Sequence, residues 1–319
     1  MTADVVIPNF NGARWLRACL DAIAAQSHPA RAVLVVDNGS TDGSLELLAA
    51  RHPSVRVIAL GANAGFAVAA NRGIQASEAE AVALVNTDVV LEPDWLGRTT
   101  AALDADPGLG SVATKMVDLA DPTRLYDAGD VLRRDGVCEQ RGHGKRDAGR
   151  FDRAEDVFAA CAGAALYRRR ALAAVGGFDE RFFLYLEDVD LGMRLRLAGW
   201  RCRYEPAVAL HAGRGSAAGI PRPVATWVER NTLLLVAKAF PLRWMPQVAY
   251  RQASMAWHAV RGARLRAHMA GIVAATPLLA AMLRERRLLR AEAVVPIEAV
   301  VPARPIRGPR AGGHPAATY

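Results

Sequence analysis

Short apolar runs alternate with longer Ala- and Leu-rich stretches over the first hundred residues of the chain. The runs are rich in Val, Ile and Leu and occupy residues 5–7, 33–36, 55–60 and 81–85. Runs of this length are typical of buried strands, whereas the stretches between them are long enough to form helices. This alternation predicts an α/β fold in which a mainly parallel sheet carries helices on both faces.

Polar residues follow each of the four runs. They form clusters at residues 8–12, 37–42, 63–66 and 86–88. Asn, Asp, Gly and Ser are ordinary turn formers and helix caps, so any one cluster has a structural explanation. Right-handed crossovers, however, bring the carboxyl ends of parallel strands to one edge, where open α/β sheets bind ligands. The four clusters together predict a ligand site, although neither a dinucleotide fingerprint nor a P-loop is present.

The basic charge of the chain is confined to one segment. The formal net charge is +8, and residues 243–290 hold nine arginines, no lysine or aspartate, and a single acid, Glu285. That segment therefore carries the whole excess charge, and the rest of the chain is balanced. A neutral body with a basic, apolar appendage indicates an anionic membrane surface as partner rather than nucleic acid.

The cysteines and the N-terminus indicate the compartment. The four cysteines lie far apart without a CxxC pair, which argues against a zinc site or a disulfide framework. The chain enters its first strand at Val5 without a basic and apolar leader, so we expect no signal peptide. We expect a cytoplasmic protein that is peripheral on the inner face of the cell membrane.

The polar clusters resemble the donor half of glycosyltransferase family 2. Residues 5–12 resemble its opening strand and loop, residues 35–43 its second strand and loop, and residues 63–73 the N-x-G-F element of its rhamnosyltransferase-like members. The resemblance implies the GT-A fold, which is Rossmann-like and binds a nucleoside-diphosphate sugar. It implies donor-binding roles for nine residues, which are Pro8, Asn9, Asn11, Asp37, Asn63, Gly65, Arg72, Asn86 and Asp88.

The resemblance also implies a divalent cation as cofactor. Asn86-Thr87-Asp88 lies where the family has its DxD motif, and only the last acid is present. A carboxylate at a strand end can hold Mg²⁺ or Mn²⁺ against a diphosphate. His211 follows a short apolar strand, where related transferases complete the metal site, and an imidazole suits Mn²⁺ as well as Mg²⁺. In a purely structural alternative, Asp88 only caps the segment that follows it, and His211 is an ordinary residue at the end of a strand.

Residues 187–195 are similar to the E-D-x-D-L-x-x-R motif of the family. A hydroxyl is a poor nucleophile, and a carboxylate that takes its proton contributes about 10²–10⁴-fold to the rate. The resemblance assigns this base to Asp188, with Glu187 beside it. Acids in a first helical turn are also favoured by the helix dipole alone. Acceptor or supporting roles are expected for Gly163, Asp190 and Arg214.

The chain divides by composition into three parts. Residues 1–222 are expected to form the catalytic domain, with a donor half at 1–100 and an acceptor half at 101–222. Residues 223–293 are expected to form a basic amphipathic helical region of the interfacial type. Its uncharged stretch, residues 267–283, has 17 residues, which is short of a span of ~20, so we expect shallow embedding rather than a crossing. Residues 294–319 are rich in Pro, Arg and Gly and predict a disordered tail.

These features predict an inverting glycosyltransferase that acts on a nucleotide sugar, with dTDP-rhamnose as the favoured donor. The expected acceptor is a hydroxyl of a saccharide carried on a polyprenyl diphosphate, in cell-wall or polysaccharide synthesis. Two alternatives stay open: a UDP-sugar-dependent transferase of the same family, and a catalytically silent glycan-binding scaffold. A nucleotidyltransferase is disfavoured because it would need a lysine-bearing glycine-rich loop near the first strand, and residues 8–12 contain no lysine.

Overall fold

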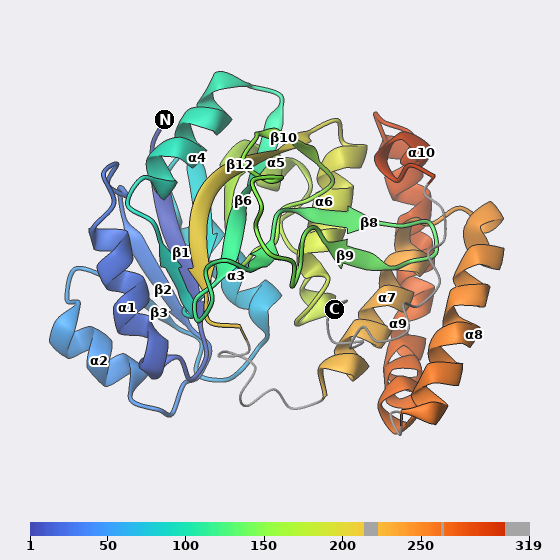
Figure 1. Ribbon diagram of the computed structural model, residues 1–319. Coiled ribbons are helices and arrows are strands. Elements are labelled where there is room, and N and C mark those ends of the chain that lie inside the picture. Colours follow the sequence, from blue (N-terminus) through green and yellow to red (C-terminus); the bar gives the residue numbers. More distant parts are fainter. Residues whose placement is uncertain (214–222, 263–264, 304–319) are drawn as a thin grey trace.

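The computed structural model describes residues 1–213, 223–262 and 265–303 (Figure 1). Its donor half alternates strands and helices as the sequence predicts, and strands β1 to β4 pair in parallel in the order β4-β1-β2-β3. The elements are β1 (Ala3–Asn9), α1 (Ala13–Ala24), β2 (Val33–Asp37), α2 (Ser44–Arg51), β3 (Arg56–Ala59), α3 (Phe66–Ala76) and β4 (Ala81–Val85).

Helix α1 illustrates why these segments adopt their conformations. Its buried residues recur at helical spacing and pack against one face of the sheet, and they are Leu16, Cys19, Leu20 and Ile23. All five residues of β4 are buried, because helices cover both faces of the sheet at its centre. The polar loops are thus pushed to the edge at which these parallel strands end.

The second half of the chain turns the sheet into a mixed one. Strand β11 runs antiparallel to both β4 and β6, whereas β12 runs parallel to β6. The expected parallel arrangement thus holds for the donor half and not for the whole sheet. The elements are β5 (Val89–Leu91), α4 (Trp95–Ala105), β6 (Leu109–Asp118), β7 (Leu125–Asp127), β8 (Asp130–Leu132), β9 (Cys138–Gln140), β10 (Glu155–Val157), β11 (Ala164–Arg168), α5 (Arg169–Ala174), η1 (Glu180–Phe182), α6 (Glu187–Leu197) and β12 (Arg201–His211).

The C-terminal helices form a layer beside α6 (Figure 1). They are α7 (Val224–Ala239), α8 (Met245–Arg261), α9 (Leu265–Glu292) and α10 (Ile297–Val300), with a short η3 (Leu242–Trp244) before α8. Most residues of α7 are buried, and they share one hydrophobic core with α6, β8 and β9. Helix α7 is therefore part of the same packed unit as the catalytic half, although composition alone places it in a separate region.

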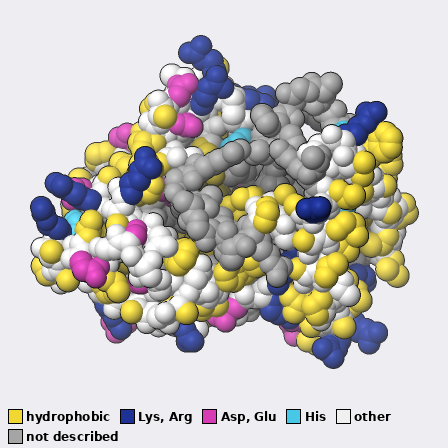
Figure 2. All heavy atoms as spheres, turned by 90° about the horizontal axis from the view of Figure 1, so that it is seen from below, with side chains coloured by type: hydrophobic (Ala, Val, Ile, Leu, Met, Phe, Trp, Pro, Cys, Tyr) yellow, Lys and Arg dark blue, Asp and Glu magenta, His cyan; other side chains and the backbone are white. Residues whose placement is uncertain are grey.

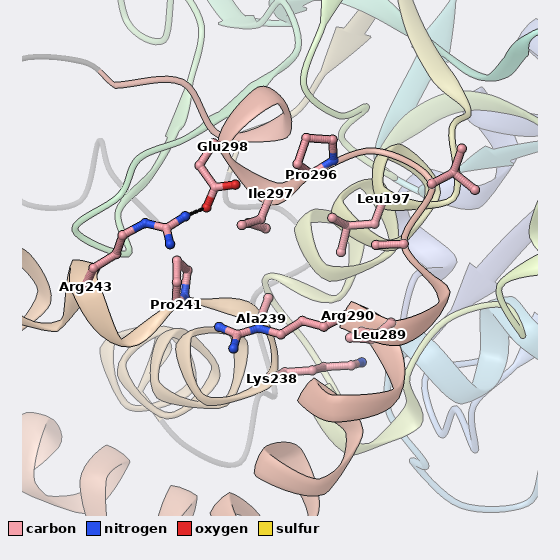
Figure 3. Close-up of a pocket in the computed structure, with 12 residues that line it drawn as sticks. Leu197, Lys238, Ala239, Pro241, Arg243, Leu289, Arg290, Pro296, Ile297 and Glu298 are labelled. Atoms are coloured by element: carbon pink, nitrogen blue, oxygen red, sulfur yellow. Dashed lines mark ion pairs between the residues drawn. The ribbon is translucent and has the colours of Figure 1, made fainter.

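The prediction of a disordered tail does not hold for residues 294–303. Helix α10 is formed there, and Val300 and Val301 are buried against the core of the helical layer. Arg243 forms an ion pair with Glu298 beside a cavity of about 400 Å³ that lies between α7, α9 and α10 (Figure 3). Apolar residues at the start of the Pro-, Arg- and Gly-rich stretch explain this order, since they have a core to join. The remainder of the expected tail, residues 304–319, lies outside the described residues.

Helix α9 is the one helix among the described residues that is long and apolar enough to cross a membrane, judged by length and composition. Only 22% of its most apolar window is buried, and that window has a mean hydropathy of 1.4. Large apolar side chains stand exposed on α8 and α9, and Figure 2 shows hydrophobic atoms gathered on that side of the molecule. They include Tyr250, Trp257, Val260, Leu265, Met269 and Val273.

Candidate active site

A cavity of about 1290 Å³ opens at the carboxyl ends of the central strands and extends to α7 and α9. Loops of the donor half line one side of it, and the start of α6 lines the other. Nine of the residues expected from the sequence line this cavity, namely Pro8, Asn9, Asn63, Gly65, Asn86, Gly163, Glu187, Asp188 and His211. Arg214 lies outside the described residues.

Asp37 does not line the cavity but organises the residue that does. One oxygen accepts a hydrogen bond from Asn9 Nδ2 at 2.8 Å, and the other accepts from the amides of Gly39 and Ser40 at 3.2 and 3.0 Å. The carboxylate is 1% exposed. Asp37 therefore holds Asn9 in place, and Asn9 Oδ1 has no hydrogen-bond partner within the described part of the chain.

Asn38 belongs to this wall and was not singled out by the sequence. Its Nδ2 donates to Asn63 Oδ1 at 3.2 Å and to the Gly65 carbonyl at 3.1 Å, and its Oδ1 accepts from the amide of Ala64. Gly65 has a φ of +92°, and a Cβ there would lie 2.5 Å from the ring of Phe183. The loop after β3 is thus closed tightly against the loop before α6, which only glycine permits.

The cavity lining also leaves out Arg72, Asn11 and Asp88. Arg72 is exposed on α3 and donates to Gln75 at 3.4 Å. Its neighbour Asn71 is buried instead and bonds the backbone of Phe178 in both directions, at 2.9 Å each. Asn11 has a φ of +51° and accepts from the amide of Thr41 at 2.8 Å, which shapes the loop after β1.

Asp88 and His211 lie close together at the end of β12, and His211 lines the cavity whereas Asp88 does not. Asp88 Oδ1 lies 3.7 Å from His211 Nε2. Asp88 is 1% exposed, and neither of its oxygens has a hydrogen-bond partner within the described residues. A buried carboxylate without a donor is costly unless a cation compensates it, so this pair fits a divalent cation. No third His, Cys, Asp or Glu joins them in a cluster within the described residues.

The imidazole of His211 is oriented by its surroundings. The ring stacks on Tyr126 with centroids 4.0 Å apart, and its Nδ1 accepts the amide proton of Gly213 at 2.8 Å. Burial lowers the pKa of His211, against the raising effect of Asp88, so the neutral ring is favoured. With Nδ1 accepting, the neutral ring carries its proton on Nε2. Because metal-bound histidines donate from the other nitrogen, binding through Nε2 requires the Gly213 contact to be released.

Asp188 and Glu187 begin α6 at the opposite side of the cavity. Asp188 accepts hydrogen bonds from the amides of Ala162 at 3.1 Å and Val189 at 2.9 Å. Burial raises the pKa of Asp188 despite these two bonds. Burial and the charge of Asp188 raise the pKa of Glu187 much further, and Glu187 Oε2 has no partner in the described part of the chain. The two neighbouring carboxyl groups therefore differ in how far their pKa values are raised, with that of Glu187 raised more.

Asp190 and Gly163 occupy supporting positions. Asp190 is fully buried away from the cavity, 2.7 Å from Arg194 Nε and 2.8 Å from Lys238 Nζ, so it anchors α6. Gly163 lines the cavity floor, and a Cβ there would lie 3.2 Å from Met116. A further buried acid, Asp127, has its pKa raised to about 7 by burial and then by the charge of Asp188. Neither its burial nor its neighbour was visible in the sequence pattern.

Comparison with known proteins agrees with this geometry. The family model for glycosyl transferase family 2 matches residues 4–176. N-acetylglucosaminyl-diphospho-decaprenol L-rhamnosyltransferase of Mycobacterium tuberculosis is 32% identical over 269 residues, which cover 75% of this chain and 87% of that protein. The pre-mycofactocin glycosyltransferase of the same organism is 29% identical over 260 residues, 79% of this chain and 51% of that protein.

Solved structures share the architecture at low sequence identity. GalNAc-T7 with UDP, GalNAc and Mn²⁺ has a TM-score of 0.61 at 12% identity, over 75% of this chain and 48% of that one. S. aureus TarS 1–349 with UDP has a TM-score of 0.55 at 18% identity, over 92% and 87%. A mannosyltransferase from Pyrobaculum calidifontis with GDP-Man and Mn²⁺ has 0.52 at 21%, over 91% and 80%. At such identities the likeness concerns the fold alone.

The expected family and fold are thereby confirmed. The matched family model spans more than half of the chain, and the rhamnosyltransferase relative covers most of both sequences. The chain belongs to glycosyltransferase family 2. It is a glycosyltransferase with the GT-A fold, and its C-terminal helices extend that fold.

Proposed function

We propose that this enzyme transfers a sugar, with rhamnose from dTDP-rhamnose as the favoured donor, to a hydroxyl of a lipid-linked saccharide with inversion at the anomeric carbon. The observation that carries the proposal is the position of Asp188. Its carboxylate lines a cavity whose opposite wall is made by Asn9, Asn38 and Asn63. A donor held by that wall would present its sugar toward the Asp188 carboxylate across the cavity.

Asp188 is proposed as the general base. The amides of Ala162 and Val189 hold its two oxygens, so the carboxylate is oriented before the acceptor binds. A side chain so placed accepts the hydroxyl proton as the oxygen attacks the anomeric carbon. Glu187, whose pKa is raised well above its usual range by burial and by the charge of Asp188, is proposed to donate a hydrogen bond to the acceptor rather than to compete as a base.

Asp88 and His211 are proposed to hold a divalent cation, Mg²⁺ or Mn²⁺. When bound, such an ion compensates the charge that develops on the departing nucleoside diphosphate. The unpartnered oxygens of Asp88 are the feature that supports this assignment. Asn9 and Asn63 offer amide groups at the nucleoside end of the same cavity, where they would fix the base and ribose.

The route to a lipid-linked acceptor is suggested by the far end of the cavity. There the lining passes from Asp188 to the start of α7 and to Arg266, Ala267 and Ala270 of α9. Val273 lies two turns beyond Arg266 on α9 and is 67% exposed. A cation beside an apolar helix face suits a diphosphate with an isoprenoid chain, the acceptor chemistry named for the decaprenol-linked relative.

The same surface supports a place on the membrane. Exposed Trp257 and Tyr250 on α8 lie in the arginine-rich segment, the composition of interfacial helices. We propose that the enzyme works in the cytoplasm, peripheral on the inner face of the cell membrane, with α8 and α9 resting in its surface.

Donor specificity is tested by calorimetry on the purified full chain. The titrants are dTDP-rhamnose, UDP-N-acetylglucosamine, UDP-glucose and GDP-mannose, each with and without Mn²⁺. Metal-dependent binding of dTDP-rhamnose alone supports the proposal. Preference for a UDP-sugar would show that the proposed donor is wrong and leave the proposed transferase activity standing. Binding of no nucleotide sugar would favour a catalytically silent glycan-binding scaffold.

A further inference from the structure

The loop that leads into the catalytic carboxylates has an unusual backbone. Phe183, Tyr185 and Leu186 have φ values of +63°, +68° and +63°, and α6 begins directly after them at Glu187. Positive φ values are rare in residues that carry bulky side chains, because they bring the side chain close to the backbone. Such a loop persists only where its surroundings hold it.

Asn231 of α7 holds the loop in this conformation. Its side chain is fully buried, and its Nδ2 donates to the carbonyls of Phe182 at 2.9 Å, Leu184 at 2.9 Å and Tyr185 at 2.6 Å. The amide group has two hydrogens, so these three carbonyls share them. Arg230 donates to Asn231 Oδ1 at 2.5 Å, which fixes the amide with its nitrogen toward the loop.

Other residues of α7 hold the same region. Trp227 stacks on Phe183 with ring centroids 4.7 Å apart, and Arg230 donates to the Arg181 carbonyl at 2.8 Å. Lys238 Nζ lies 2.7 Å from Asp179 and 2.8 Å from Asp190, which precede the loop and follow it. The contacts of Asn231 differ from these because they fall on the backbone carbonyls that adjoin the positive-φ residues, those of Phe182, Leu184 and Tyr185.

We propose that Asn231 is a positioning residue for Asp188, a role that rests on the proposed function of Asp188 as the base. Three carbonyls can point toward one amide only while the loop keeps its left-handed turns. Those turns set where α6 begins and hence where the Asp188 carboxylate stands in the cavity. Without the amide the loop relaxes toward negative φ, and the carboxylate moves away from the acceptor while the wall at Asn9 and Asn38 stays intact.

The test compares variants of the full chain in a transfer assay with the donor that wild type uses. Asn231→Leu keeps the branched shape and the number of side-chain heavy atoms and removes the donors, whereas Asn231→Ser keeps one donor. Leu234→Ala, on the same helix and fully buried in its core, is the matched control for lost stability. For each chain we measure kcat, the donor Kd by calorimetry, the pH profile of kcat and the melting temperature, working well below the lowest melting temperature.

The proposal predicts that Asn231→Leu lowers kcat by about 10²-fold, the scale of a misplaced catalytic group, with the donor Kd within about threefold of wild type. The kcat of Asn231→Ser should fall between those of wild type and Asn231→Leu. If the Leu variant does not fold, the kcat of Asn231→Ser alone tests the proposal. Leu234→Ala should melt earlier and keep kcat. If Asn231→Ser and Asn231→Leu lose kcat only as far as Leu234→Ala does, the positioning role is overturned. A wild-type chain that transfers no sugar would instead overturn the proposed function itself.

Discussion

Asp88 and His211 face each other at the end of the sheet, with Oδ1 and Nε2 3.7 Å apart, and the carboxylate lacks a hydrogen-bond donor within the described residues. The relationship places a carboxyl group without a hydrogen-bond donor in the protein interior. Binding sites often keep such groups at a cost in stability, because the ligand completes them. The pair therefore links the stability of the metal-free chain to its function.

Asp88→Asn should separate those two properties. Removal of the buried charge should raise the free energy of unfolding of the metal-free chain by about 1–3 kcal/mol. The same change should abolish the gain in donor affinity that Mn²⁺ gives the wild type. Chemical denaturation in the presence of a chelator and calorimetric donor titration check the two halves. Unchanged Mn²⁺-dependent binding in the variant would remove Asp88 from the metal site.

The two carboxyl groups at the start of α6 should respond differently to amide substitution. Asp188→Asn should lower kcat by about 10²–10⁴-fold, because the base is lost. Glu187→Gln should stay within about tenfold of wild type, because the raised pKa of Glu187 keeps that group neutral already. Steady-state kinetics of both variants check this, and equal losses would assign both acids to proton transfer.

The pH profile follows from the same shifts. Since burial raises the pKa of Asp188, activity should be lost on acidification at a pH above the ordinary aspartate value of about 3.9. Asp127, with a pKa of about 7, and Glu187 titrate nearby, so the acidic side of the pH–activity profile should be broad.

The raised pKa of Glu187 also affects stability. Protonated Glu187 favours folding at low pH, and this contribution is lost as the pH rises through its raised pKa. Glu187→Gln should therefore melt later than wild type at alkaline pH.

The interfacial face of α8 should govern binding to vesicles. Arg261 lies over the ring of Trp257 at 4.8 Å, and Trp257 is 58% exposed. Arg261→Glu changes two units of charge, each worth about 1 kcal/mol near an anionic surface, so partitioning should fall at least tenfold. Arg51→Glu, an exposed arginine at the end of α2, is the control. Sedimentation with phosphatidylglycerol vesicles measures both, and equal losses would deny a special role to α8.

The order of residues 294–303 can be checked by two valine substitutions. Val301 is fully buried, whereas Val294 is 74% exposed. Val301→Ala should lower the free energy of unfolding by about 1–2 kcal/mol through lost burial, and Val294→Ala by less than about 0.5 kcal/mol. Denaturant titration measures both. Similar small effects of both substitutions would show that this segment is disordered, as its composition suggests.

The sequence predicted the parts of the site that depend on local pattern. Apolar runs followed by polar clusters locate β1 to β4, and parallel pairing carries Asn9, Asn63 and Asn86 to one cavity. The acid-rich start of α6 was readable for the same reason, because its motif is contiguous. Helix existence in the C-terminal region was also predicted from composition.

The other features of the site and of the fold depend on long-range packing, which no local sequence pattern predicts. Asp37 turns inward because Asn9 lies within hydrogen-bond reach from the neighbouring strand. Asn231 acquires its role only when α7 packs beside a loop about 46 residues earlier in the chain. Val301 is ordered because α6 and α7 leave an apolar surface for it. None of these partners is adjacent in sequence, so no local pattern reports them.

The central claim is that Asp188 drives a single displacement, and the stereochemistry of the product tests it most directly. The full chain is incubated with its preferred nucleotide sugar, Mn²⁺ and a polyprenyl-diphosphate-linked saccharide in vesicles, and the anomeric configuration of the product is read by NMR. The account predicts the configuration opposite to that of the donor, with product formation lost in Asp188→Asn. A product with retained configuration, or an Asp188→Asn variant as active as wild type, would contradict it.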